Sequence, residues 1–225
     1  MKTSWRVELP QLVIIAGLFI WSAVLWPTAP ERMPVHFDVA GNVDRYGSKA
    51  EGLLLIPATA LGLYLLLRFL PAIDPARANY PAFAGAYAVI RIALVVVMAL
   101  IDAALLLPVM GVPLNVGVVV RLTLGGLFVV FGSVMGKVRP NWFVGIRTPW
   151  TLASKRSWVQ THRLGGWVFV VSGLVLMASS TFASPVAAVV AFAVMGAGML
   201  WTLVYSYLAF RDDPERFLAV STRPE

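Results

Sequence analysis

The sequence predicts an all-α membrane protein with six transmembrane helices. Hydrophobic residues make up 59% of the chain and charged residues 13%, whereas about 25% of a soluble domain is charged. Lys and Arg also concentrate between alternate apolar runs, as in multi-pass proteins. Six such runs approach the length needed to cross about 30 Å of hydrocarbon. They are Leu9–Trp26, Leu53–Leu70, Phe83–Leu107, Leu114–Met135, Gly166–Phe182 and Val186–Phe210.

The composition excludes several kinds of site. The chain has no cysteine, which rules out disulfides, thiolate metal ligands and cysteine nucleophiles. The formal net charge is +7, and charge placement relative to a membrane accounts for this excess. We therefore expect the lipid bilayer as a partner and no direct binding of nucleic acid.

The first apolar run follows Lys2 and Arg6, as it would in a signal peptide. The run is longer than a typical signal-peptide core, and no clear A-x-A cleavage site follows it. We expect an uncleaved anchor. At the other end, only residues 183–185 separate the last two runs, which predicts a tight helical hairpin.

The distribution of cations predicts the orientation. Of the 18 Lys and Arg residues, Arg32, Arg45 and Lys49 fall on one side, and Arg121 lies within the fourth run. The remaining cations fall on the other side or at its helix ends. Because basic loops stay in the cytoplasm, we expect a multi-pass protein of the cell membrane with both termini cytoplasmic.

The loop after the first run, residues 28–52, is then on the outer side. Val35, Phe37 and Val39 alternate with His36 and Asp38, which is the pattern of a strand. The residues "AGN" favour a turn, and residues 43–45 favour a returning strand. We predict a short β-hairpin that must pack on the helix ends, because a two-stranded ribbon is weak alone.

Three polar residues of this loop, His36, Asp38 and Asp44, are of types that bind metals. Their spacing matches no standard ligand pattern. We favour hydrogen bonds among these side chains and the loop backbone, and we predict no metal site.

The longest polar stretch, residues 136–166, lies on the cytoplasmic side. Pro140 and Pro149 prevent a continuous helix, and Gly145 permits a positive φ. Residues 139–150 should therefore form an ordered, non-helical excursion. Thr151 is a plausible N-cap for a short interfacial helix, which should break or bend at residues 165–166 before the fifth span. Trp158 and His162 would share one face of that helix.

Four charged residues lie within predicted spans, namely Arg68, Arg91, Asp102 and Arg121. Asp102 and Arg121 stand at similar distances before and after the turn near Gly111, so an antiparallel hairpin places them at similar depth. We predict a salt bridge or a shared water-filled cavity, with helix docking favoured over a ligand or ion path. Arg68 and Arg91 are near cytoplasmic helix ends, where we expect them to snorkel.

The stretch "RPNWFVGIRTPWTL", followed by Trp158, "THR" and the pair of glycines, resembles the signature of the SdpI family of bacterial integral membrane proteins. The family often has a serine and acidic residues after this element. Ala153, Lys155 and Arg156 stand there instead, which makes the local surface more basic. The matching positions are Arg139, Pro140, Asn141, Gly145, Arg147, Thr148, Pro149, Trp150, Trp158, Thr161, His162 and Gly165.

The outer loop resembles a domain of unknown function that often precedes this signature. The two resemblances together imply an N-terminal membrane domain, residues 1–110, with three spans and the outer loop. An SdpI-like domain, residues 111–225, would hold three spans and the signature. The matching loop positions are Pro34, His36, Phe37, Gly41, Asp44, Gly47 and Lys49.

Catalysis is not expected, and neither is a cofactor. His36 and His162 lie on opposite sides of the membrane, so they cannot share a metal or a triad. The sequence has no H-E-x-x-H, G-x-S-x-G or Walker A motif.

The family resemblance implies immunity to, or sensing of, a secreted toxic peptide. The family's namesake also holds a transcriptional repressor at the membrane, which implies a cytoplasmic regulatory partner. We expect Asn141, Arg147 and Trp150 to fix the shape of the signature. The alternative is a small-molecule or ion transporter that uses Asp102 and Arg121.

Overall fold

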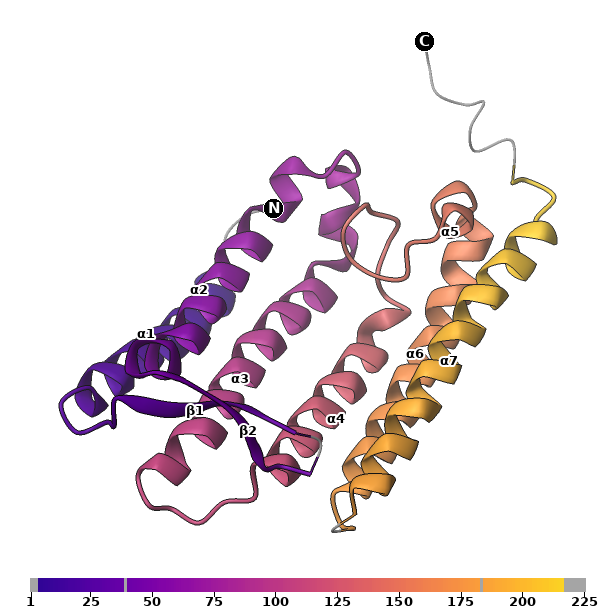
Figure 1. Cartoon of the computed structure of the whole chain (residues 1–225). Helices are drawn as coiled ribbons and strands as arrows, with labels where there is room; N and C mark the ends of the chain where they lie inside the picture. Colours follow the sequence, from indigo (N-terminus) through magenta and orange to yellow (C-terminus); the bar gives the residue numbers. More distant parts are fainter. Residues whose placement is uncertain (1–3, 39, 183, 217–225) are drawn as a thin grey trace.

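The computed structural model describes residues 4–38, 40–182 and 184–216. Lys2, Val39 and Ala183, which entered the sequence analysis, lie outside these ranges. Within these ranges, six helices are long and apolar enough to cross a membrane, which confirms the predicted fold class (Figure 1). They are α1 (Trp5–Leu25), α2 (Lys49–Ile73), α3 (Ala84–Val109), α4 (Val116–Met135), α6 (Lys155–Ser179) and α7 (Pro185–Arg211).

Three shorter features complete the fold. A 3₁₀ helix, η1 (Arg77–Phe83), leads into α3, and α5 (Pro149–Ala153) precedes α6. Strands β1 (Arg32–Phe37) and β2 (Val43–Ser48) form an antiparallel pair, which confirms the predicted hairpin. The hairpin lies at one end of the helix array, and α1 begins and α7 ends at the other (Figure 1).

The polar side chains of the hairpin bond to one another and to the turn. His36 Nδ1 lies 2.6 Å from Asp44 Oδ1. Asp38 Oδ1 accepts hydrogen bonds from the backbone N–H groups of Ala40 and Asn42, at 2.9 Å each. The bonds from Asn42 and Ala40 hold the pKa of Asp38 below its usual range. This is the hydrogen-bonding arrangement that the sequence favoured.

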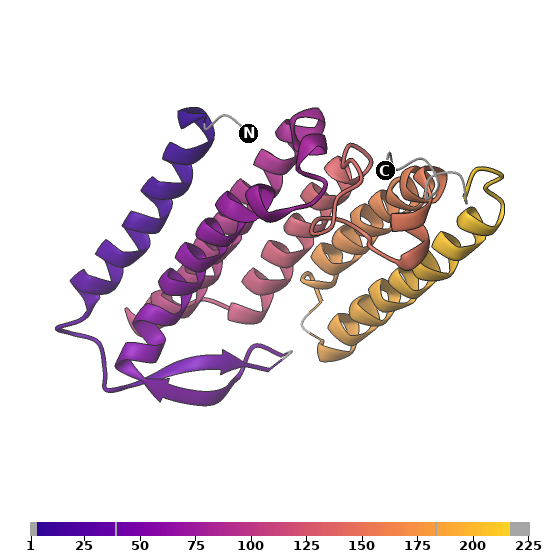
Figure 2. The same cartoon turned by 90° about the horizontal axis from the view of Figure 1, so that it is seen from above.

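The hairpin packs on helix ends, as expected. Met33 is buried in a cluster with Leu53 of α2 and Leu106 of α3. At the tip, Gly41 has φ +90°, and a Cβ there would lie 2.8 Å from the backbone nitrogen of Gly117 in α4. The hairpin therefore extends across the helix ends from α2 to α4 (Figure 2).

The helices pack in two neighbouring groups. Helices α1, α2 and α3 contact one another, and α6 contacts both α4 and α7. The groups meet at α3 and α4, which are joined by a turn in which Gly111 has φ +83°. The predicted domain boundary at residues 110–111 falls in this turn. The division into two domains remains a prediction.

Glycines bring α4 and α6 into backbone contact. A Cβ on Gly132 would lie 2.5 Å from the carbonyl oxygen of Gly166, and one on Gly173 would lie 2.5 Å from that of Gly125. Small residues permit this close approach in membrane helices. The break expected at residues 165–166 is wrong, because α6 continues through them without interruption. Gly166 serves instead in the contact with α4.

A buried ion pair joins α1 to α3, and it corrects the expectation that Arg91 snorkels. Arg91 is 2% exposed, and its Nη1 and Nη2 donate to Glu8 Oε1 and Oε2 at 2.9 and 2.7 Å. Tyr64 of α2 donates to Glu8 Oε2 at 2.9 Å. Arg68 Nε lies 3.7 Å from Glu8 Oε1, so it too faces this carboxylate.

The predicted salt bridge between Asp102 and Arg121 is not formed. Asp102 is 0% exposed, and neither of its carboxylate oxygens has a hydrogen-bond partner among the described residues. Equal depth in a hairpin fixes the height of two side chains. It does not fix their rotation about the helix axes, at about 100° per residue.

Removing the Glu8 carboxylate should destabilise the first helix group. Breaking a buried pair leaves an uncompensated charge, here on Arg91, at a cost of about 3–5 kcal/mol. We expect Glu8→Gln to cause a clear drop in the thermal unfolding temperature of the protein in detergent. The matched control is Glu31→Gln, because Glu31 forms an exposed pair with Lys49.

The double variant Glu8→Leu/Arg91→Leu should recover most of the loss, since replacing both partners with apolar residues leaves no buried charge. Equal unfolding temperatures for Glu8→Gln and Glu31→Gln would contradict this account.

Candidate functional site

The signature segment, residues 136–166, lies where the two helix groups meet at the end opposite the hairpin (Figure 1). Residues 138–147 contain no helix or strand, which confirms the non-helical excursion expected at residues 139–150 except at its end, where Pro149 and Trp150 already belong to α5. Helix α5 and the first half of α6 complete the segment.

Asn141 holds the first turn of the segment. Its side-chain amide donates to the carbonyl oxygens of Arg139 and Val144, at 2.9 Å each. Its side-chain oxygen accepts from the backbone N–H groups of Phe143 and Val144, at 2.9 and 2.6 Å. Asn141 is buried, so one side chain provides hydrogen bonds that backbone structure would otherwise supply.

Residues from the α2–α3 connection fix the same turn, and the sequence analysis missed them. Asp74 Oδ2 accepts from the Trp142 N–H at 3.1 Å and from the Tyr80 hydroxyl at 2.9 Å. Asn79 donates to the Pro140 carbonyl at 2.7 Å. An Asp followed by Pro favours a turn, but no local signal indicates a partner some 60 or more residues away.

Gly145 and His162 form the second fixed point. Gly145 has φ +110°, and a Cβ there would lie 2.3 Å from His162 Nε2. That nitrogen accepts from the Ile146 N–H at 3.1 Å, while Nδ1 lies 2.8 Å from the Trp158 carbonyl oxygen. These two bonds require a neutral ring with its proton on Nδ1. The expected shared face of Trp158 and His162 is present, with the rings stacked 4.1 Å apart.

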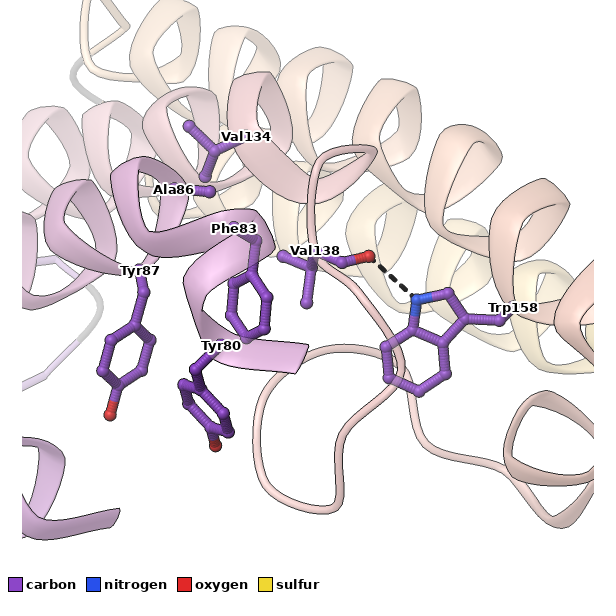
Figure 3. Packing of buried hydrophobic residues seen from close by; sticks show 7 residues of the cluster. All are labelled: Tyr80, Phe83, Ala86, Tyr87, Val134, Val138 and Trp158. Atoms are coloured by element: carbon purple, nitrogen blue, oxygen red, sulfur yellow. Dashed lines mark hydrogen bonds between the residues drawn. The ribbon is translucent and has the colours of Figure 1, made fainter. Parts of the chain in front are cut away.

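Trp158 connects the segment to the apolar core. Its ring nitrogen donates to the Val138 carbonyl at 2.9 Å. The indole belongs to a buried cluster that also holds Tyr80 and Phe83 of η1 and Tyr87 of α3 (Figure 3). This cluster spans both helix groups.

The caps of the short helices differ from expectation. Thr148, not Thr151, is the N-cap of α5, and the two threonines form a reciprocal capping box. Ser154 then caps α6 by accepting from the Ser157 N–H at 2.9 Å. The helix expected from Thr151 is therefore two helices, and the second is continuous with the fifth span.

Polar contacts and one aromatic pair fasten the segment to α7. Thr148 and Ser206 hydroxyls lie 3.1 Å apart, and Ser157 donates to the Ser206 carbonyl at 2.7 Å. The Trp150 ring packs 5.3 Å from that of Tyr207. Beyond the end of α7, the Ser154 hydroxyl donates to Asp213 and is the main cause that holds the pKa of this carboxylate below its usual range.

Arg147 stabilises the loop from its exposed side. Its Nη1 donates to the Trp142 carbonyl at 2.7 Å. Asn141, Arg147 and Trp150, the three residues expected to fix the segment's shape, thus all make contacts that can do so. Their importance for function remains a prediction.

An apolar cavity of about 240 Å³ lies under the excursion. Ile90 of α3, Phe131 of α4 and Phe169 of α6 line it together with Gly145 and Ile146. A small apolar group fits such a space. The charged side chains of the segment lie outside it.

The polar side chains of the site are engaged in holding its backbone. Both ring nitrogens of His162 are engaged in structural bonds. Within the described ranges, no three His, Cys, Asp or Glu side chains are grouped so that they could hold a metal ion. The segment is instead a rigid irregular surface with exposed cations, including Lys137, Arg139 and Arg147.

Comparison with known proteins agrees with the resemblance seen in the sequence. Residues 137–206 match the SdpI/YfhL protein family, and residues 13–61 match a domain of unknown function, DUF1648. The chain is 24% identical over 172 residues to the immunity protein SdpI of Bacillus subtilis (strain 168). The aligned region covers 76% of this chain and 80% of that protein. No solved structure matches the chain. The chain is a multi-pass membrane protein, and its residues 137–206 are similar to the SdpI/YfhL family.

Gly145→Ala should loosen the signature segment. The substitution adds a Cβ where the backbone has a positive φ and where His162 already occupies the space. We expect the free energy of unfolding to fall by at least about 2 kcal/mol, in the range for strained backbone positions. The measurement is a lower unfolding temperature.

The matched control for this substitution is Gly136→Ala. Gly136 has φ −67°, and nothing lies within 4 Å of a Cβ placed there. Equal stability of the two variants would show that the Gly145–His162 contact does not hold the segment.

Proposed function

We propose that the protein protects its bacterium against a secreted toxic peptide, or senses such a peptide, in the manner of an immunity protein. The observation that carries this proposal is the similarity to the immunity protein SdpI over most of both chains. Two ordered non-helical surfaces, at opposite ends of the helix array, support it (Figure 1). One could meet a peptide outside the cell and the other a regulatory protein inside.

The hairpin is suited to the outer role. His36, Asp44 and Arg45 are exposed on it, and Arg45 Nη1 pairs with Glu51 Oε1 at 2.8 Å. Its backbone is held by the contacts of Met33 and Gly41 with the helices. A rigid surface loses little conformational entropy when it binds a partner.

The signature segment is suited to the inner role. Its exposed cations would attract an acidic protein surface or anionic headgroups. Its shape is set by Asn141, Asp74 and His162, so the cations have defined positions. A cytoplasmic regulatory partner would recognise both the shape and the charge.

Arg147→Ala should abolish protection without loss of protein from the membrane. The test uses the native host with the gene deleted, challenged with conditioned medium from its parent strain. Wild-type protein should restore growth, and Arg147→Ala should not. Arg77→Ala is the matched control, because Arg77 is an exposed cation of η1 outside the signature segment.

A deleted strain that grows normally in this medium would contradict the immunity proposal. Full rescue of growth by Arg147→Ala would contradict the role of the signature segment but not the immunity proposal itself.

The proposed orientation places both termini and the signature segment in the cytoplasm. The chain has no cysteine, so single-cysteine variants can be labelled without background. In intact cells, a membrane-impermeant maleimide should label Tyr46→Cys, because Tyr46 is 54% exposed on the hairpin. Lys137→Cys should react only after the cells are opened. The reverse pattern would overturn this orientation.

A transporter is the second candidate. The observation that favours it is the buried Asp102 carboxylate, whose two oxygens have no hydrogen-bond partner among the described residues. An ionisable group inside a membrane protein often marks an ion or substrate path. If the protein is a transporter, Asp102→Asn would abolish the flux of the transported ion or small molecule in proteoliposomes. If it is an immunity protein, the same substitution would leave protection intact.

A further inference from the structure

A groove with one cationic side chain opens on the α4–α6 pair, away from the cavity under the signature segment. It encloses about 370 Å³. Ser133 and two glycines of α4 and its cap line one side, and Arg163, Gly166 and Trp167 line the other. The two hollows share no lining residue.

The groove exists because glycines bring the two helices together without filling the space beside the seam. Gly132 and Gly166 are in backbone contact, and both lie on its floor. Gly136 is exposed, and nothing lies within 4 Å of a Cβ built on it. Since α4 and α6 are both long and apolar enough to span the membrane, we expect lipid beside the groove.

The cation that lines the groove has no partner among the described residues. Arg163 is exposed and makes no hydrogen bond or ion pair with a described residue, and the same holds for the side chain of Lys137, which follows Gly136. The carbonyl end of α4 is nearby, where cations are favoured, but Arg163 donates to none of its carbonyls. Trp167 is 68% exposed, and tryptophan is favoured at the headgroup depth.

We propose that this groove binds an anionic glycerophospholipid. One acyl chain lies along the glycine floor between α4 and α6. The phosphate lies at the mouth, where Arg163 and Lys137 supply the positive charge. Trp167 flanks the lipid at the boundary between headgroup and acyl chain.

A second copy of the chain fits the groove less well. A two-fold interface brings the same surface of both copies together. It would therefore place Arg163 and Lys137 of one copy near the same cations of the other, and like charges in an interface oppose association.

The test is native mass spectrometry of the full-length protein in detergent, titrated with phosphatidylglycerol or with zwitterionic phosphatidylcholine. We expect preferential retention of phosphatidylglycerol. Arg163→Gln should weaken the binding of phosphatidylglycerol about fivefold, the loss expected for one cation at an anionic lipid. Gly136→Leu keeps both cations but fills the groove, and it should remove most of the binding.

Two control variants separate the site from general effects. Arg77→Gln removes one exposed cation from η1, in the other helix group. Gly62→Leu adds a side chain to α2 at a position where nothing lies within 4 Å. Both should bind phosphatidylglycerol as wild type does.

Three outcomes would overturn the proposal. The first is equal retention of the two lipids by the wild type. The second is an equal effect of Arg163→Gln and Arg77→Gln, or no effect of Gly136→Leu, in correctly folded protein. The third is a dimer that Gly136→Leu dissociates, because a second copy would then occupy the groove.

Discussion

The absence of hydrogen-bonding solvent within a bilayer is the constraint on which this structure depends. Polar groups at that depth must find partners in the protein. Glu8 binds Arg91 and Tyr64, and the Ser22 hydroxyl donates to the Leu53 carbonyl at 2.6 Å. These contacts join α1, α2 and α3 where apolar side chains alone gain little from leaving lipid. The need to pair these buried polar groups therefore determines how the first three helices pack.

The second helix group meets the same constraint through close backbone approach and a satisfied loop. Glycines let α4 and α6 touch along their length. The signature segment then crosses the end of this pair as irregular backbone, which is tolerated near a membrane only where protein groups satisfy it. Asn141, Asp74 and His162 supply those groups. These residues thus stabilise the backbone of the signature segment, and the exposed cations of the segment are held on that fixed backbone.

The two proposals use adjoining surfaces of the same framework, and both include cations of the signature segment. The immunity proposal needs the two ends of the helix array, where the hairpin and the signature segment face water. The lipid proposal needs the side of the α4–α6 pair, where glycines leave a groove and Arg163 is exposed. Both follow from one arrangement, because the glycine seam that shapes the groove also sets the position of α6, which carries Trp158 and His162.

The sequence by itself determined the properties that depend on local pattern. Apolar length gave the six spans, strand alternation gave the hairpin, and Pro140, Gly145 and Pro149 gave the ordered excursion. Only the tertiary structure decided which polar groups meet. Glu8 and Arg91 are 83 residues apart. A depth argument like that used for Asp102 and Arg121 would have placed them at one level, but depth leaves helix rotation open, and the Asp102–Arg121 bridge failed for that reason. Cap choice was undecided in the same way, because Thr148 and Thr151 are both good caps and the contact of Thr148 with Ser206 in α7 comes from packing.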